Sequence, residues 1–130
     1  MAILLRNLKM HAMTSRERVR AALNFTEPDR IPVDLGGHRS SGIAAIAYHQ
    51  LRKHLSLPDR PIRVYDMVQQ LAIVDEDVLD LFGVDTLEMG RGFLLDDDDW
   101  KPWVLPDGTP CEIPYYVNLE KNGADWHLLD

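Results

Sequence analysis

Apolar residues recur with a helical period in three parts of the chain. In the first, Val19, Ala22 and Leu23 lie at i, i+3 and i+4. Thr14 or Ser15 before them can accept the first backbone N–H groups as a helix cap. The second of these regions ends with arginine, lysine and histidine in its last turn, and the helix dipole favours positive charge at that end. The pattern therefore predicts helices over residues 15–24, 42–55 and 66–82.

Two short apolar runs have the length of buried strands rather than of helices. Pro28 biases Glu27 away from the helical region, so the first helix must end before it. Residues 31–35 then favour a buried parallel strand. Gly83 is a suitable C′ residue for the third helix, and residues 84–89 are predicted to return as a second strand. Because helices and strands alternate, the sequence indicates an α/β fold whose order is that of an opening barrel.

The last part of the chain carries turn signals and no helical period. Asp107-Gly108 and Asn122-Gly123 each favour a tight turn between residues suited to strands. Residues 93–130 are therefore predicted to form a β-hairpin insertion. Asp96 to Asp99 lie within it, and we expect a solvated acidic loop there rather than a cation site, because four consecutive carboxylates cannot all face one ion.

A polar loop that contains two glycines follows the first predicted strand. Glycine permits positive φ and close backbone approach, and reactive groups of α/β barrels lie at the C-terminal ends of strands. Arg39 suits a carboxylate and His38 titrates near physiological pH, so an anionic small-molecule substrate is expected. The alternative, that both only cap nearby helix or loop groups, stays open. The candidate substrate-binding residues are Asp34, Gly36, Gly37, His38, Arg39, Glu88 and Arg91.

Length and composition limit what this fold can contain. A complete α/β barrel needs roughly 250 residues, whereas the chain has 130. We therefore expect the opening portion of a barrel, incomplete as given. At 45% hydrophobic and 27% charged residues, the composition is that of an ordinary globular chain.

Charge and cysteine content exclude some partners. The net charge of −7 argues against a nucleic-acid surface, which would be basic. One cysteine, Cys111, cannot form an internal disulfide, and this favours the cytoplasm. The apolar patch in residues 1–12 is interrupted by Arg6 and Lys9, so no membrane segment is predicted. Those residues are expected to be a disordered extension.

Three segments together carry a resemblance to a known family. They are residues 14–19 (Thr-Ser-Arg-Glu-Arg-Val), 27–33 (Glu-Pro-Asp-Arg-Ile-Pro-Val) and 76–85 (Glu-Asp-Val-Leu-Asp-Leu-Phe-Gly-Val-Asp). In order and spacing they resemble the amino-terminal end of the uroporphyrinogen decarboxylase superfamily, over Met13 to Leu119. The resemblance implies that residues 13–130 are part of a TIM (β/α)8 barrel. It also implies that the intact parent is an enzyme.

The resemblance is closer to the corrinoid-linked methyltransferases of that superfamily than to its porphyrin-pathway decarboxylases. The decarboxylases carry Arg-Gln-Ala-Gly-Arg after Pro-Val, whereas here Gly37 and Ser41 stand where the two arginines belong. Glu88 or Gly92 stands where their aspartate follows the second strand. The resemblance therefore implies a corrinoid-linked, zinc-dependent methyltransferase, with uroporphyrinogen decarboxylation in heme biosynthesis as the alternative. It implies zinc, a corrinoid and a corrinoid protein for the parent, and no cofactor or metal ligand in this segment.

A different class of function is also open. A barrel site needs groups from several strands, and only two are predicted here, so the isolated chain is expected to be inactive. It would then be a truncated product, or a module that associates with itself or with a partner through open strand edges. A homo-oligomer is possible under this hypothesis.

Overall fold

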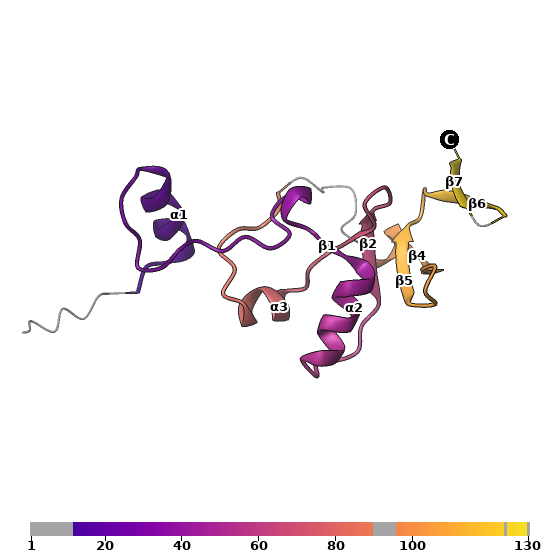
Figure 1. The fold of residues 1–130 in the computed structure, drawn as a ribbon, viewed down its shortest axis with the longest axis horizontal. Coiled ribbons are helices and arrows are strands. Elements are labelled where there is room, and N and C mark those ends of the chain that lie inside the picture. The colour runs from indigo at the N-terminus through magenta and orange to yellow at the C-terminus, as the bar shows by residue number, and fades with distance from the viewer. Residues whose placement is uncertain (1–11, 90–95, 124, 130) are drawn as a thin grey trace, which may run out of the picture.

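A computed structural model of the chain describes residues 12–89, 96–123 and 125–129. The molecule is elongated, with the first helix at one end and a β-hairpin at the other (Figure 1). In the described residues, none of the helices has the length and apolar character needed to cross a membrane. The elements in chain order are α1 (Ser15–Leu23), the 3-10 helix η1 (Arg39–Ser41), β1 (Ile43–Ala44), α2 (Ala45–His54), β2 (Ile62–Asp66), β3 (Leu71–Ala72), α3 (Glu76–Leu81), the 3-10 helix η2 (Asp97–Asp99), β4 (Trp100–Val104), β5 (Pro110–Pro114), β6 (Asn118–Asn122) and β7 (Asp125–Leu129).

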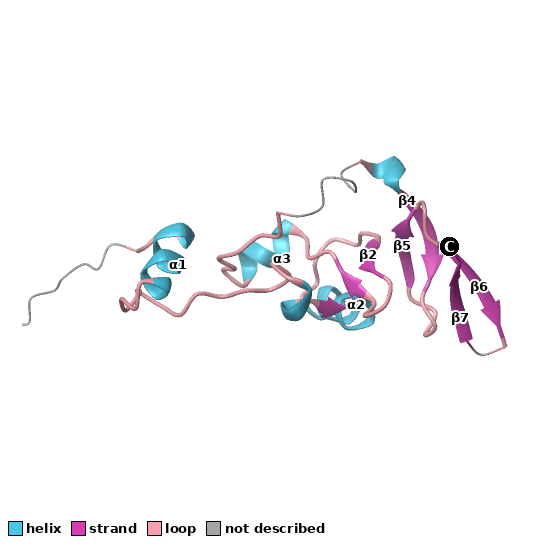
Figure 2. Ribbon diagram, turned by 90° about the horizontal axis from the view of Figure 1, so that it is seen from above, coloured by secondary structure: helices cyan, strands magenta, loops and turns pink. Residues whose placement is uncertain are grey.

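The strands form a mixed sheet and a separate hairpin (Figure 2). The sheet has five strands in the order β1-β3-β2-β5-β4. Strands β2 and β5 run parallel, with Ile62 opposite Cys111, and the remaining pairs are antiparallel. Strands β6 and β7 pair only with each other. The α/β class predicted from the sequence is confirmed, and the sheet of the described residues does not close into a barrel.

The core lies where α2 covers the sheet. Tyr48 of α2 is fully buried, as are Val64 of β2 and Ile113 of β5. Helix α2 buries Ala45, Tyr48 and Arg52, at i, i+3 and i+7, so one stripe of the helix faces the strands. The predicted second helix is thus confirmed, although it begins at Ala45 rather than at residue 42.

Helix α1 forms as predicted but packs differently. Thr14 is the cap: its hydroxyl accepts from the Glu17 N–H, and the Glu17 carboxylate accepts from the Thr14 N–H in return. The buried residue of α1 is Arg18, whereas Leu23 is 73% exposed. Phe25 after the helix is fully exposed. The apolar face of α1 is therefore uncovered by the described residues.

The predicted helix over residues 66–82 is wrong in its first half. Residues 66–72 contain the end of β2, a turn and β3, and only Glu76–Leu81 is helical. The Asp66 carboxylate accepts from the N–H groups of Val68 and Gln69, which turns the chain back after β2. Gln70 follows with φ of +53°, outside the helical region. Gly83 does end α3, with φ of +58°, as its C′ position predicts.

The two predicted barrel strands are extended segments without strand pairing. Residues 31–34 and 84–89 carry no regular secondary structure. Ile31 is 83% exposed and Leu87 is 72% exposed, so these segments are not the buried strands that were expected. The physical reason is that, among the described residues, one backbone hydrogen bond joins the two segments, from the Asp85 N–H to the Val33 carbonyl, and a ladder needs a repeated series of such bonds.

Both predicted hairpin turns are confirmed. Strands β4 and β5 pair around Gly108, with φ of +86°, and β6 and β7 pair around Gly123, with φ of +64°. Such positive φ values explain why glycine stands at both turns. Most of the predicted extension (1–12) and the start of the predicted insertion (93–95) lie outside the described residues.

Candidate functional site

The two extended segments lie side by side and carry the candidate site. The N–H of Asp85 donates to the carbonyl of Val33 at 2.8 Å. One residue further along both segments, the Thr86 hydroxyl donates to the Asp34 carboxylate at 2.5 Å. Because contacts advance in the same direction on both, the segments run parallel. The loop that contains the two glycines therefore starts beside Thr86.

The geometry of the loop explains why glycine occupies each of these two positions, for a different reason at each. Gly36 has φ of +78°, which other residues adopt only at a cost, and its N–H donates to the Ser41 carbonyl at 3.0 Å. A Cβ on Gly37 would lie 2.4 Å from an Asp34 carboxylate oxygen and 2.7 Å from the Thr86 hydroxyl. Both roles expected of glycine, positive φ and close approach, are present in the loop.

Asp34 organises the loop through hydrogen bonds. Its carboxylate accepts from Thr86 and from the Gly37 N–H at 3.0 Å. The bonds from Thr86, then from Ser41 and Gly37, outweigh burial and lower the pKa of the Asp34 carboxyl below its usual value. A carboxylate held in this way can accept protons only under acid conditions, so Asp34 acts here as a fixed acceptor.

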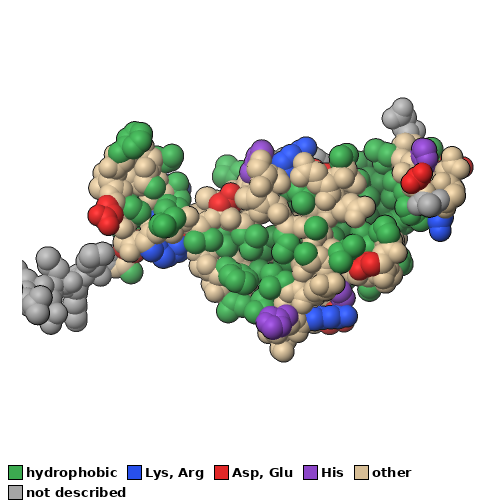
Figure 3. All heavy atoms as spheres, viewed as in Figure 1, with side chains coloured by type: hydrophobic (Ala, Val, Ile, Leu, Met, Phe, Trp, Pro, Cys, Tyr) green, Lys and Arg blue, Asp and Glu red, His purple; other side chains and the backbone are tan. Residues whose placement is uncertain are grey.

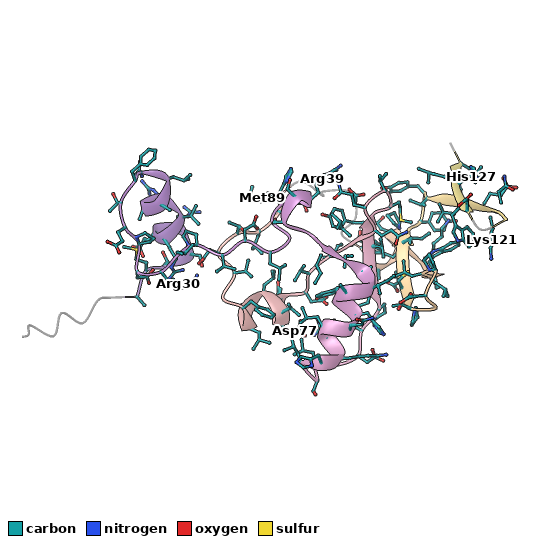
Figure 4. The ribbon with its side chains drawn as sticks, viewed as in Figure 1. Arg30, Arg39, Asp77, Met89, Lys121 and His127 are labelled. Carbon is teal, nitrogen blue, oxygen red and sulfur yellow. The ribbon has the colours of Figure 1, made fainter. Side chains whose placement is uncertain are left out.

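His38 and Arg39 follow on η1. The His38 ring accepts from the Ser40 N–H through Nδ1 at 3.2 Å, which caps η1. Arg39 is 62% exposed at its side chain and lies 3.5 Å from the Asp66 carboxylate. Figure 4 labels Arg39 and Met89 along the same edge of the molecule. The capping alternative for His38 is thus present, while the Arg39 guanidinium remains largely accessible to a ligand.

Two candidates from the sequence remain, Glu88 and Arg91. Glu88 is exposed on the second segment. Arg91 lies outside the described residues. Sequence reasoning missed Thr86 and Asp66, which bind Asp34 and Arg39 respectively. No local pattern could have indicated them, because Thr86 and Asp34 are 52 residues apart.

A buried ion cluster fixes the two segments to α1. The Asp85 side chain is fully buried and accepts from Arg18, from Arg30 at 2.7 Å and from the Val33 N–H at 2.9 Å. Burial acts to raise the pKa of the Asp85 carboxyl, but these hydrogen bonds and one from Ser15 outweigh it and hold the pKa at about 2. Asp29 also binds Arg18, at 2.6 Å. The cluster joins α1, residues 29–33 and the second segment.

The described residues offer no ligand set for a metal. Across 12–89, 96–123 and 125–129, no three His, Cys, Asp or Glu side chains are grouped so that they could hold an ion. In the acidic loop, Asp97 is 92% exposed and pairs with Arg63 at 2.5 Å. The described residues therefore supply no candidate ligands for the zinc, which the family resemblance implies for the intact parent and not for this segment.

Comparisons with protein-family models, with curated proteins and with solved structures find no match to this chain.

Cys111 is placed where its thiol is protected. It lies on β5, is 4% exposed, and burial raises the pKa of its thiol to about 11. Since the thiolate is the nucleophile, we expect a disulfide reagent at about pH 8 to label the native chain roughly 100-fold more slowly than the chain unfolded in guanidinium. Equal rates in the two states, followed by absorbance of the released thiolate, would show that β5 opens freely.

Proposed function

We propose that this chain is the amino-terminal portion of a (β/α)8 barrel of the uroporphyrinogen decarboxylase type, whose parent is a corrinoid-linked, zinc-dependent methyltransferase. One observation carries the proposal. Residues 31–35 and 84–89, far apart in sequence, run parallel and adjacent, and the first leads into a loop of glycine and polar side chains. Adjacent parallel strands whose C-terminal ends hold ligand-binding loops are what an α/β barrel uses to build its site.

The exposure of these segments supports the barrel part of the proposal. Ile31, Leu87 and Met89 are 83%, 72% and 98% exposed. Strands of an all-parallel barrel are covered on both faces by interior side chains and by helices. In a barrel, other strands and helices would cover these apolar side chains. Their exposure on the two segments is therefore expected if those covering elements lie outside the described residues.

The geometry at Gly37 supports methyl transfer over porphyrinogen decarboxylation. This is the position at which the resembling decarboxylases carry an arginine that meets substrate carboxylates. A Cβ here would be 2.4 Å from Asp34, so an arginine could enter only if the contact between Asp34 and Thr86 were broken. The loop is thus built around glycine, as in the methyltransferase branch. Zinc and the corrinoid would be held by residues outside the described part of the chain.

A second function is favoured by a separate observation. On the chain alone, apolar side chains lie exposed along both segments and on α3, where Leu81 is 57% and Phe82 is 44% exposed. Figure 3 shows hydrophobic side chains across the middle of the molecule. Contiguous apolar surface of this kind is typical of a site for protein association. A non-catalytic module that associates with itself is the alternative.

The test separates the two functions. The longest product encoded together with this segment is purified beside the 130-residue chain. Thiol-dependent demethylation of methylcobalamin in the presence of zinc is followed by absorbance, and loss of carboxyl groups from uroporphyrinogen by porphyrin fluorescence. Demethylation by the longer product supports the proposal. A reading frame that stops after Asp130, with a stable oligomer by light scattering and neither activity, supports the module and contradicts the proposal.

Arg39 gives a residue-level test of anion binding in the longer product. We expect Arg39→Ala to raise the KM for mercaptoacetate about 10-fold, since a charged contact to the carboxylate is lost. The KM for the neutral thiol mercaptoethanol should stay unchanged. The melting temperature should move by about 1 °C at most, because Arg39 is exposed and the Asp66 carboxylate keeps the N–H groups of Val68 and Gln69 as donors. Arg16→Ala on α1 is the matched control, and an equal rise in both KM values would make Arg39 structural.

A further inference from the structure

A groove lies between the five-stranded sheet and the terminal hairpin, far from the candidate site. It has a volume of about 730 Å³ and is lined mainly by apolar side chains, including Trp103, Leu105, Pro106 and Trp126. Hydrophobic side chains cover the surface between the sheet and the hairpin in Figure 3. The volume lies in the range of small-molecule sites, and largely apolar walls with few polar groups are typical of them.

The groove has a fixed aromatic wall. Trp103 of β4 and Trp126 of β7 pack edge to face, with ring centroids 4.7 Å apart and planes at 74°. Leu105 behind them is 3% exposed and belongs to the core. The two rings, nearly perpendicular to each other, form an apolar corner, and their mutual packing leaves little side-chain entropy to lose on binding.

Lys121 supplies the charge of this groove. It pairs across the hairpin with Trp126, so both side chains lie on the face that meets the sheet. Its ammonium lies 5.7 Å from the centre of the Trp126 ring, and none of the described carboxylates is within ion-pairing distance of it. His127, also labelled in Figure 4, is opposite Glu120 and lies on the other face. Apart from the buried thiol of Cys111, Lys121 is the one ionisable group that the described residues contribute to the lining.

We propose that this groove binds a small aromatic anion, with its ring against Trp103 and Trp126 and its acidic group against the Lys121 ammonium. The proposal goes beyond the proposed barrel function and does not depend on it. Charge decides the class of ligand: among the described residues, the lining offers one ammonium group and no carboxylate. An aromatic cation would be repelled by Lys121, a neutral ring would leave Lys121 unused, and an aromatic anion can contact both the rings and the ammonium.

The experiment uses the whole chain and two fluorescent probes that differ by one group. Anilinonaphthalene sulfonate carries a sulfonate, and N-phenylnaphthylamine is the same ring system without it. We expect the sulfonate to bind one site with a Kd about 10-fold lower than the neutral probe. Lys121→Met should abolish that preference: the affinity for the sulfonate probe should fall about 10-fold, and the affinity for the neutral probe should stay unchanged. Trp126→Leu should weaken both.

Controls keep this result specific. Lys53→Met, at the exposed end of α2, removes the same charge elsewhere and should change neither probe. Near-ultraviolet circular dichroism confirms that Lys121→Met and Lys53→Met keep the wild-type tryptophan signal, and far-ultraviolet circular dichroism confirms that Trp126→Leu keeps its secondary structure. Equal affinities of the two probes for the wild-type chain would overturn the proposal. So would a titration that never saturates, or sulfonate binding that Lys121→Met leaves intact.

Discussion

Asp85→Asn is expected to lower the free energy of unfolding by about 3 kcal/mol, because it leaves Arg18 without one of its two buried partners. The Asp85 carboxylate is fully buried and accepts hydrogen bonds from Arg18, from Arg30 and from the Val33 N–H. Asparagine keeps the shape of the side chain but offers one neutral acceptor oxygen in place of the two charged oxygens of the carboxylate. Urea unfolding followed by far-ultraviolet circular dichroism measures the loss, and hydrogen exchange should rise first at the amides of α1.

The same variant tests the pH dependence of stability. The pKa of the Asp85 carboxyl is held at about 2, below its ordinary value, so its contribution is present above the unfolded pKa and is lost as pH falls toward 2. The wild-type chain should therefore lose stability between about pH 4 and pH 2, and Asp85→Asn should lose less over that window. Asp80→Asn on the exposed side of α3 is the control. Matching acid profiles for wild type and Asp85→Asn would contradict this assignment.

Sequence patterns predicted those elements whose signals are local. The cap at Thr14 needs only Glu17, three residues away, and both lie within the first turn of α1. Gly108 and Gly123 specify their turns through φ alone. Each of these features is fixed by neighbouring residues, so a single sequence contains all the information that it requires.

Elements decided by distant contacts could not be predicted in this way. Leu71, Val74 and Val78 fit a helical stripe, yet Leu71 belongs to β3 because it pairs with Ala44 of β1 and with Asp66 of β2. A local period does not reveal such partners. The same reason explains why residues 31–35 are not a strand here: their apolar pattern indicates a buried strand, but in the described chain a single backbone hydrogen bond joins them to residues 84–89.

The same physical reasons explain why only part of the candidate site was predicted from the sequence. The requirement for glycine at positions 36 and 37 was indicated by its place after an apolar run, and positive φ and close approach are both present. The partner that makes Gly37 necessary is Thr86, which only the fold brings to Asp34. The ion cluster on Asp85 was missed altogether, because charged residues scattered over 18–85 give no periodic signal.

The second large effect is expected at Arg52, which holds α2 to α3. Its side chain is 5% exposed and donates to Asp75 at 2.8 Å, to Asp77 at 2.9 Å and to the Pro58 carbonyl at 2.8 Å. Arg52→Met keeps the apolar stem but removes the buried charge between Asp75 and Asp77, leaving them with the Tyr48 hydroxyl and the half-exposed Arg60. We therefore expect a loss of about 2–3 kcal/mol in urea unfolding. Lys53→Met, on the exposed side of the same helix, should change stability by about 0.5 kcal/mol or less.

A double-mutant cycle distinguishes a specific ion pair from general loss of packing. The Arg52 guanidinium is the largest of the groups that lower the pKa of the Asp77 carboxyl, so the charged aspartate loses most of its stabilisation when Arg52 is removed. Asp77→Asn should therefore destabilise the wild-type chain. In the Arg52→Met background it should be neutral or stabilising, because it removes repulsion between Asp77 and Asp75. Additive losses across the cycle would mean that Arg52 acts through its stem and its bond to Pro58, and not through its charge.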